Sequence, residues 1–373
     1  ISPDAAKKIA VIGPAADDPL ALLGGYSFPV HLILSDMAAS TDNVVTPLAA
    51  LKKTFGADRI LAAKGCDVLG KRQAGSPVFP GDVADNTNLD HKSPVLNDLS
   101  QIPAAVDAAR QAELAIVCVG DLAGLFQTGT VGEGSDTDSL RLPGAQQALI
   151  EAVVATGTPT VVVLYSGRPY CLGDIESKLA AYVMAFAGGQ EGGAALAEVL
   201  SGQVEPSGHL TISVPRSVGA VPYVYNHKFK SSGTPVAFHF GSRYPFGHGL
   251  SYTSFEYDDL TIEKARVAIA DGDVVASFRI RNTGPRAGVA VPQLYIRDKL
   301  ASSVRPVKEL KAFERIALKA GEAARVKFVV PVDMLNFTNM AGQRIVEPGD
   351  FDIQIGSSSA RIHLTGSITV EGD

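Results

Sequence analysis

The stretch LAIVCVG at residues 114–120 is a continuous apolar run that ends in glycine. A run of this length without polar alternation predicts a strand that is buried on both faces of a sheet. A second run, PTVVVLY at 159–165, repeats the pattern after a segment with helical periodicity at 143–156. A strand, a helix and a second buried strand in this order are typical of a parallel sheet.

The same alternation of strand and helix extends over residues 1–215. Further short strands are predicted at 8–14 and 59–62. Further helices are predicted at 47–53, 101–112 and 190–201. The pattern indicates an α/β sandwich domain, in which a mostly parallel sheet is covered by helices on both faces. Residues 70–100 are rich in Pro, Gly, Asn and Asp and are predicted to form a long surface excursion.

The hydrophobic period changes to two after residue 255. The stretches ASFRIR at 276–281 and RVKFVV at 325–330 alternate strictly, and turn sequences separate such runs. This pattern predicts an all-β antiparallel sandwich over residues 256–373. Residues 216–255 are rich in aromatics, which flexible linkers avoid, and are predicted to form an inter-domain connection that packs down.

The composition excludes several classes of protein. The 373 residues include 33 basic and 39 acidic side chains, a net charge of −6, and no basic stripe is visible. We therefore expect no nucleic-acid partner and no anionic membrane partner. No apolar run reaches the roughly 18 residues of a membrane-spanning helix, so the chain is predicted to be soluble.

The residues that bind metals and cofactors form no recognisable motif. The three cysteines are odd in number and lack C-x-x-C spacing, and the seven histidines are scattered. We expect no metal and no cofactor. Glycine-rich phosphate-binding motifs and the G-x-S-x-G motif are also absent, which disfavours a nucleotide-binding α/β protein and a serine hydrolase.

A glycine-rich loop follows the run at 114–120. Ligand sites in α/β sheets lie just beyond the carboxyl ends of the strands, so this loop is well placed for function. Within it Glu133 stands between Gly132 and Gly134. Glycine on both sides gives a permissive backbone that can project the carboxylate into a cleft, although most loop glutamates are simply solvated. Glu133 is the candidate catalytic residue.

Several motifs support a family resemblance. They occur in one order along nearly the whole chain and comprise GEGSD at 132–136, LRLPGAQ at 140–146, YSGRPY at 165–170, GGQEGG at 188–193, EPSGHL at 205–210, YPFGHGLSY at 244–252 and RPVKELKAF at 305–313. In these motifs the chain resembles the C-terminal portion of glycoside hydrolase family 3, of the β-glucosidase/β-xylosidase type. The resemblance implies an α/β sandwich domain followed by a fibronectin type III-like domain.

The resemblance also implies a reaction. Enzymes of this family remove β-linked sugars from non-reducing ends with retention of configuration, using an aspartate nucleophile on an N-terminal (β/α)₈ barrel and an acid/base carboxyl on the sandwich domain. The acid/base position corresponds to Glu133. We expect the barrel, on a separate chain or in a segment before Ile1, to be the partner, and the chain alone to be inactive.

Other residues have weaker functional interpretations. Phe126 and Gln127 are candidates for the leaving-group side of a substrate pocket, where aromatic faces stack on sugars; loop packing is the alternative. Asp36 follows a serine, as the family's nucleophile does. Its position, however, belongs to the sandwich domain and not to the end of a barrel strand, which disfavours Asp36 as the nucleophile. Thr137 stands where the family usually has arginine, which puts an Asp–Arg pair at this point in doubt.

Some alternatives stay open at the level of sequence. The same two domains could form a non-catalytic carbohydrate-binding or scaffolding protein. The choice between glucose and xylose, the linkage preference and the existence of a homo-oligomer are not determined by the sequence. Localisation is also undetermined, because a signal peptide would lie upstream of Ile1.

Overall fold

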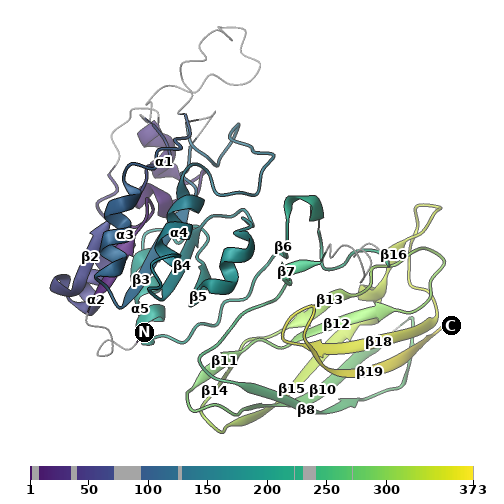
Figure 1. Ribbon diagram of the computed structural model, residues 1–373. Helices are drawn as coiled ribbons and strands as arrows, with labels where there is room; N and C mark the ends of the chain where they lie inside the picture. Colours follow the sequence, from purple (N-terminus) through teal and green to yellow (C-terminus); the bar gives the residue numbers. More distant parts are fainter. Residues whose placement is uncertain are drawn as a thin grey trace, which may run out of the picture. The chain divides into compact units, whose positions relative to one another are not determined.

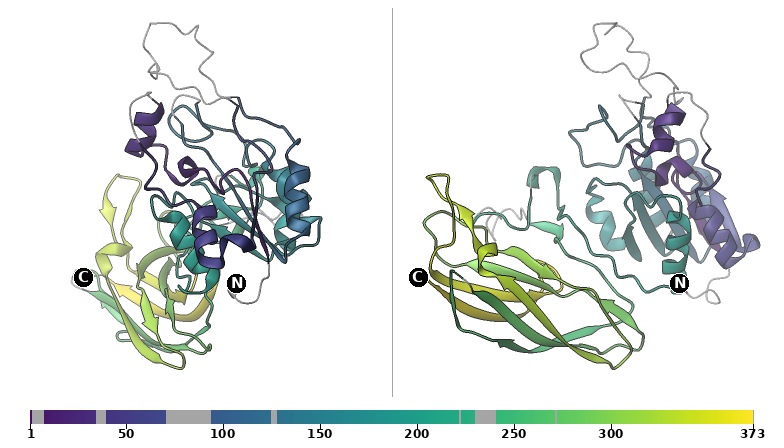
Figure 2. Two further views of the ribbon diagram at one scale, coloured as in Figure 1. Left: turned by 90° about the vertical axis from the view of Figure 1, so that its left-hand side faces the viewer. Right: turned by 180° about the vertical axis from the view of Figure 1, so that it is seen from behind.

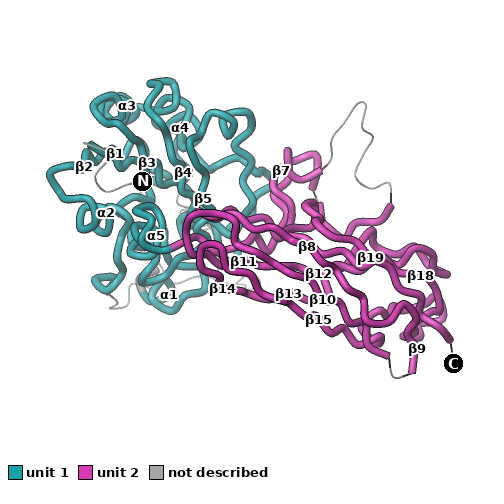
Figure 3. The backbone as a smooth tube through the Cα atoms, turned by 90° about the horizontal axis from the view of Figure 1, so that it is seen from below, with its two compact units in different colours: residues 1–204 teal, residues 205–373 magenta. Residues whose placement is uncertain are grey.

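Two compact units make up the protein, residues 1–204 and 205–373, called unit 1 and unit 2 below (Figure 3). The computed structural model describes residues 1, 8–34, 40–70, 94–124, 128–221, 223–229, 241–270 and 272–372. The three-part division at residues 215 and 255 stays a prediction.

Unit 1 contains a five-stranded sheet in which every neighbouring pair is parallel, with the order β2-β1-β3-β4-β5 (Figure 1). The strands are β1 (Ile9–Ile12), β2 (Ile60–Ala63), β3 (Leu114–Gly120), β4 (Thr160–Tyr165) and β5 (Ala181–Met184). The described helices are α1 (Phe28–Leu34), α2 (Pro47–Phe55), α3 (Ile102–Arg110), α4 (Gln146–Val154) and α5 (Gly192–Ser201), with short 3₁₀ turns η1 (Pro19–Leu22), η2 (Ala57–Arg59) and η4 (Gly173–Lys178).

Strand β3 shows how the sheet is buried on both faces. Ile116 and Cys118 pack into one core together with residues of α2 and α5. Val117 and Val119, which point the other way, pack into a second core together with residues of α3 and α4. All four side chains are fully buried, as expected for a parallel strand between two helical layers. The predicted α/β sandwich is therefore confirmed.

The elements differ from the sequence-based expectation in detail. Helix α4 begins at Gln146 rather than at 143, because Gly144 has a φ of +67°, which is incompatible with a helical turn. Strand β5 and helix α1 were not predicted; they have only four and seven residues, too few for a clear periodic pattern.

The strand order creates a topological switch point between β1 and β3. The chain leaves β1 for β2 on one side and then crosses to β3 on the other side, so the loops after β1 and β3 diverge. Ligand sites in such sheets lie in the crevice at this point. The backbones approach closely here: a Cβ atom on Gly13 would lie 2.0 Å from the carbonyl oxygen of Cys118.

Unit 2 is an antiparallel sandwich around one apolar core. Figure 2 shows its strands in layers. Its main sheets have the orders β15-β10-β8 and β13-β12-β18-β19-β9, and every pair is antiparallel except β9–β19. The strands of these two sheets are β8 (Phe255–Ile262), β9 (Arg266–Ala268), β10 (Asp273–Asn282), β12 (Gln293–Asp298), β13 (Glu309–Phe313), β15 (Ala323–Pro331), β18 (Gly349–Gly356) and β19 (Ile362–Glu371).

Three strand pairs and two 3₁₀ turns are the remaining elements among the described residues of unit 2. They are β6 (Val214–Pro215) with β7 (Ser242–Tyr244), β11 (Gly288–Ala290) with β14 (Ile316–Leu318), β16 (Phe337–Thr338) with β17 (Arg344–Ile345), and the turns η5 (Val218–Ala220) and η6 (Val332–Leu335). In the described parts of both units, no helix combines the length and apolar character needed to cross a bilayer.

Candidate functional site

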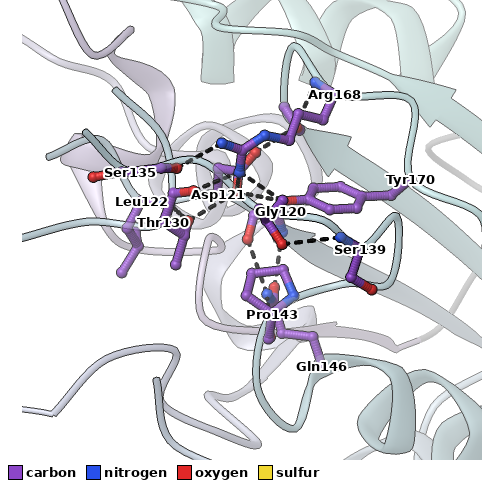
Figure 4. A network of polar contacts seen from close by, with 12 residues as sticks. Gly120, Asp121, Leu122, Thr130, Ser135, Ser139, Pro143, Gln146, Arg168 and Tyr170 are labelled. Atoms are coloured by element: carbon purple, nitrogen blue, oxygen red, sulfur yellow. Dashed lines mark hydrogen bonds and ion pairs between the residues drawn. The ribbon is translucent and has the colours of Figure 1, made fainter. Parts of the chain in front are cut away.

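The loop that follows β3 is tied together at its two ends by one side chain. Gln146, the fully buried first residue of α4, accepts a hydrogen bond from Gly120 N (2.8 Å) through Oε1. Its Nε2 donates to Gly120 O and to Pro143 O, both at 2.9 Å. The exit from β3 and the entry to α4 are thus held at a fixed separation (Figure 4).

A buried carboxylate forms the base of the loop. Asp121, 4% exposed, accepts hydrogen bonds through Oδ1 from Tyr170 OH (2.6 Å) and Thr130 Oγ1 (2.8 Å) and through Oδ2 from Ser166 Oγ (2.5 Å). Arg168 Nη1 lies 3.5 Å from Oδ1 (Figure 4). Burial, and then the Asp121 charge, raise the pKa of Tyr170, which keeps the phenol a neutral donor.

Arg168 connects this base to the segment that carries Glu133. Its guanidinium donates to Thr130 O (2.5 Å) and to Ser135 O (2.7 Å). Ser135 N in turn donates to Gly132 O (3.0 Å). One arginine on the loop after β4 therefore holds the chain on both sides of Glu133.

A tight crossing of the backbone requires glycine at position 132. Gly124 N donates to Val131 O (2.9 Å), so the loop folds back on itself. Gly132 has a φ of +119°, and a Cβ atom there would lie 1.8 Å from Gly124 O. Only glycine fits both the dihedral angle and the space.

Glu133 is exposed at the tip of this supported loop. Tyr26, on the segment before α1, donates a hydrogen bond from its hydroxyl to Glu133 Oε2 at 3.4 Å. Loss of solvent around the phenol, followed by the charge and hydrogen bond of Glu133, raises the pKa of Tyr26 above its ordinary value. A carboxylate in this position can exchange protons with a molecule bound at the exposed face.

Tyr26 is a neighbour of Glu133 that sequence reasoning missed. The sequence feature that could have indicated this contact is the pair of glycines that precedes Tyr26. A Cβ atom on Gly25 would lie 2.9 Å from Gly132 Cα, so the two loops can meet because residues 25 and 132 are both glycine. Phe126, Gln127 and Asp36 lie outside the described residues. Among the residues that are described, no three His, Cys, Asp or Glu side chains are grouped to hold a metal ion.

Two family models match the chain. Residues 1–252 match the model of the glycosyl hydrolase family 3 C-terminal domain, and residues 290–359 match the model of a fibronectin type III-like domain. The first match covers unit 1 and extends into unit 2, and the second lies within unit 2.

Similar curated proteins are glycosidases. The chain is 37% identical to a periplasmic beta-glucosidase of Salmonella typhimurium, over 95% of the chain and 45% of that protein. It is 35% identical to a beta-xylosidase of Formosa agariphila, over 98% of the chain and 46% of that protein. The chain thus spans about half the length of these relatives.

Solved structures show the same fold. A beta-glucosidase involved in saponin metabolism from intestinal bacteria superposes with a TM-score of 0.84 at 31% identity, over 100% of the chain and 51% of that structure. A beta-glucosidase from Listeria innocua in complex with isofagomine superposes with a TM-score of 0.81 at 25% identity, over 100% of the chain and 47% of that structure.

Proposed function

Because the chain belongs to glycoside hydrolase family 3, we propose that it supplies the acid/base carboxyl of a retaining, exo-acting β-glycosidase, and that this carboxyl is Glu133. The substrate class is a glycoside or oligosaccharide with a terminal non-reducing β-linked glucose or xylose, the two sugars named in the similar proteins. The nucleophile comes from a (β/α)₈ barrel of the same enzyme, and without it the two units do not hydrolyse substrate.

Glu133 has two tasks in this mechanism. In the first step the nucleophile attacks the anomeric carbon while Glu133 gives a proton to the leaving oxygen. In the second step Glu133 takes a proton from the water that hydrolyses the glycosyl-enzyme. A retaining enzyme needs its two carboxyl groups about 5–5.5 Å apart, so the tip of the loop has to be held with little freedom.

The observation that supports the proposal most strongly is that the backbone on both sides of Glu133 is fixed. The residue is exposed, while the chain on either side is fixed by Arg168, by the Asp121 network and by the crossing at Gly132. A loop glutamate whose side chain is only solvated does not need its flanking backbone to be fixed in this way. Phe126 and Gln127, in the same loop, are proposed to border the leaving-group side of the substrate.

The test is to join this chain to a family (β/α)₈ barrel and to compare Glu133→Gln with the unchanged assembly. On a β-glycoside with a poor leaving group, kcat/KM is expected to fall by about 10²- to 10⁴-fold. On a dinitrophenyl β-glycoside, whose leaving group needs no proton, the rate of the first step should stay close to that of the unchanged assembly. Azide, which needs no general base, should restore turnover and release a β-glycosyl azide.

Asp138→Asn is the matched control, because Asp138 is an exposed acid five residues further along the same loop. It should leave kcat/KM near the level of the unchanged assembly. Full activity of Glu133→Gln on the poor substrate would refute the assignment of Glu133. An assembly that binds β-glycosides without cleaving them would favour a carbohydrate-binding role.

A further inference from the structure

Unit 2 contains a pocket that the proposed reaction does not use. Its volume is about 300 Å³, within the range of small-ligand sites, and every lining residue belongs to unit 2. It is formed by the segment before β6, the segment leading into β8, strand β11 and the turn between β18 and β19.

The charged and titratable groups in the pocket wall are all basic or neutral. Arg361, His209, His363 and Tyr257 line it. None of the described lining residues is Asp or Glu. The carboxylate of Glu205, next to the lining, accepts a hydrogen bond through Oε2 from the lining residue Val289 N at 3.2 Å, and its buried Oε1 has no hydrogen-bond partner among the described residues.

Arg361 brings to the pocket a positive charge without a direct ion-pair partner. Among the described residues no carboxylate lies within ion-pair distance of its guanidinium, although other arginines of unit 2 have such partners. Burial and the nearby Arg361 lower the pKa of His363. Burial, His209 and Arg361 lower the pKa of His248. The basic groups are therefore close enough to repel one another.

The turn backbone and one histidine ring at the pocket are held in place. Ser357 N donates to Arg361 O, and Arg361 N donates to Ser358 Oγ, both at 3.0 Å, which closes the turn that carries Arg361. His363 stacks on Tyr257 with ring centroids 4.2 Å apart and contacts Ser357 Oγ through Nε2 at 2.9 Å. The turn backbone and the His363 ring are therefore held in place, whereas the Arg361 side chain is exposed and its guanidinium is open to a ligand.

A cavity lined by an unpaired arginine, two histidines and several hydroxyl groups favours a negatively charged oxygen ligand, since guanidinium and hydroxyl groups donate to such oxygens. We propose that this pocket binds a small oxyanion: inorganic phosphate or sulfate, or the carboxylate of a sugar acid. The site is independent of Glu133 and of the reaction proposed above.

The test is titration of the full chain with sodium phosphate, sodium sulfate, sodium glucuronate and, as a neutral control, glucose, followed through the NMR signals of the histidine rings. We expect saturable binding of at least one anion with a Kd in the millimolar range, shifts in His209 and His363, and no response to glucose. Phosphate or sulfate binding without glucuronate identifies an inorganic oxyanion, and the reverse identifies a sugar acid; either result supports the site.

Arg361→Gln should weaken binding at least tenfold. Arg344→Gln removes the same charge from an arginine of unit 2 that pairs with Asp333 and does not line the pocket, and it should leave the Kd unchanged. His363→Gln provides a second variant within the wall and should also weaken binding. No saturable binding by the unchanged chain, or equal Kd values for Arg361→Gln and Arg344→Gln, would overturn the proposal.

Discussion

The base and the tip of the loop after β3 both depend on a carboxylate, and the two carboxylates are in opposite environments. Asp121 is buried and accepts three hydrogen bonds from hydroxyl groups with Arg168 close by. Glu133 is exposed, and the hydrogen bond described for its side chain comes from the Tyr26 hydroxyl.

The two environments suit a carboxylate to two different tasks, holding the loop in place or reacting with a ligand. A buried carboxylate that accepts three hydrogen bonds holds other groups in place but has no access to a ligand. An exposed carboxylate can reach a ligand, but it has a defined position only if its backbone is held by other groups. Under the proposed function the loop divides these two tasks between Asp121 and Glu133, and the following variants test that division.

The largest effect on stability is expected from Asp121→Asn. The change keeps the shape of the side chain but removes the negative charge that faces Arg168 and the three hydroxyl groups that donate to Asp121. Breaking one partner of a buried ion pair typically costs about 3–5 kcal/mol. Urea unfolding should show this loss in unit 1. Asp138→Asn, at the exposed end of the loop, should change the unfolding free energy by less than about 0.5 kcal/mol. Equal losses would show that the buried Asp121 and the exposed Asp138 do not differ in their contribution to stability.

Gly132→Ala should have the next largest effect. Strained backbone at a non-glycine residue costs about 1–3 kcal/mol, and the clash with Gly124 O adds displacement of the loop that carries Glu133. In an assembly with the barrel, activity should fall together with stability. Gly157→Ala is the control: its φ is also positive, at +81°, but no atom lies within 4 Å of the new Cβ, so only stability should fall. Unchanged activity in Gly132→Ala would contradict the role given to the crossing.

Tyr170→Phe should cost less. It removes one hydroxyl donor to Asp121 while the donors from Thr130 and Ser166 remain, and a single hydrogen bond to a charged group contributes about 1.5–3 kcal/mol. The expected loss in urea unfolding lies at the lower end of that range, below that of Asp121→Asn. A larger loss than for Asp121→Asn would move the centre of the network from the carboxylate to the phenol.

The smallest effect concerns the tip. The Glu133 carboxylate disfavours a negative phenolate beside it, so Glu133→Gln should lower the pKa of Tyr26 toward its ordinary value. Because the pKa of the folded state would fall, Tyr26 should ionise at a lower pH than before. Ultraviolet titration of Glu133→Gln, with the spectrum of Glu133→Gln/Tyr26→Phe subtracted, isolates this phenol among the ten tyrosines. An unchanged Tyr26 pKa would show that the two groups do not interact in solution.

The sequence was informative wherever the signal is local. The apolar run at 114–120 is β3, with the same bounds, because a strand buried on both faces leaves no polar residue in its interval. The position of Glu133 between two glycines marked it as a candidate. The hydrogen bond from Tyr26 was not predictable, because the two residues are 107 positions apart and each occurs in a polar loop without periodicity.

The network around Asp121 shows the same limit. Asp121 and Ser166 directly follow β3 and β4, and these strands are neighbours in the sheet, so their carboxyl ends meet at one edge. Nothing local in either segment indicates that pairing, since strand order depends on how the helices cover the two faces.

The sequence by itself determined the two kinds of unit and the buried strands, because the hydrophobic period acts over a few residues. It also offered an acid between two glycines, Glu133, as a candidate. Only the tertiary structure decided which polar groups support that acid, because those partners come from separate segments that the strand order of the sheet brings together.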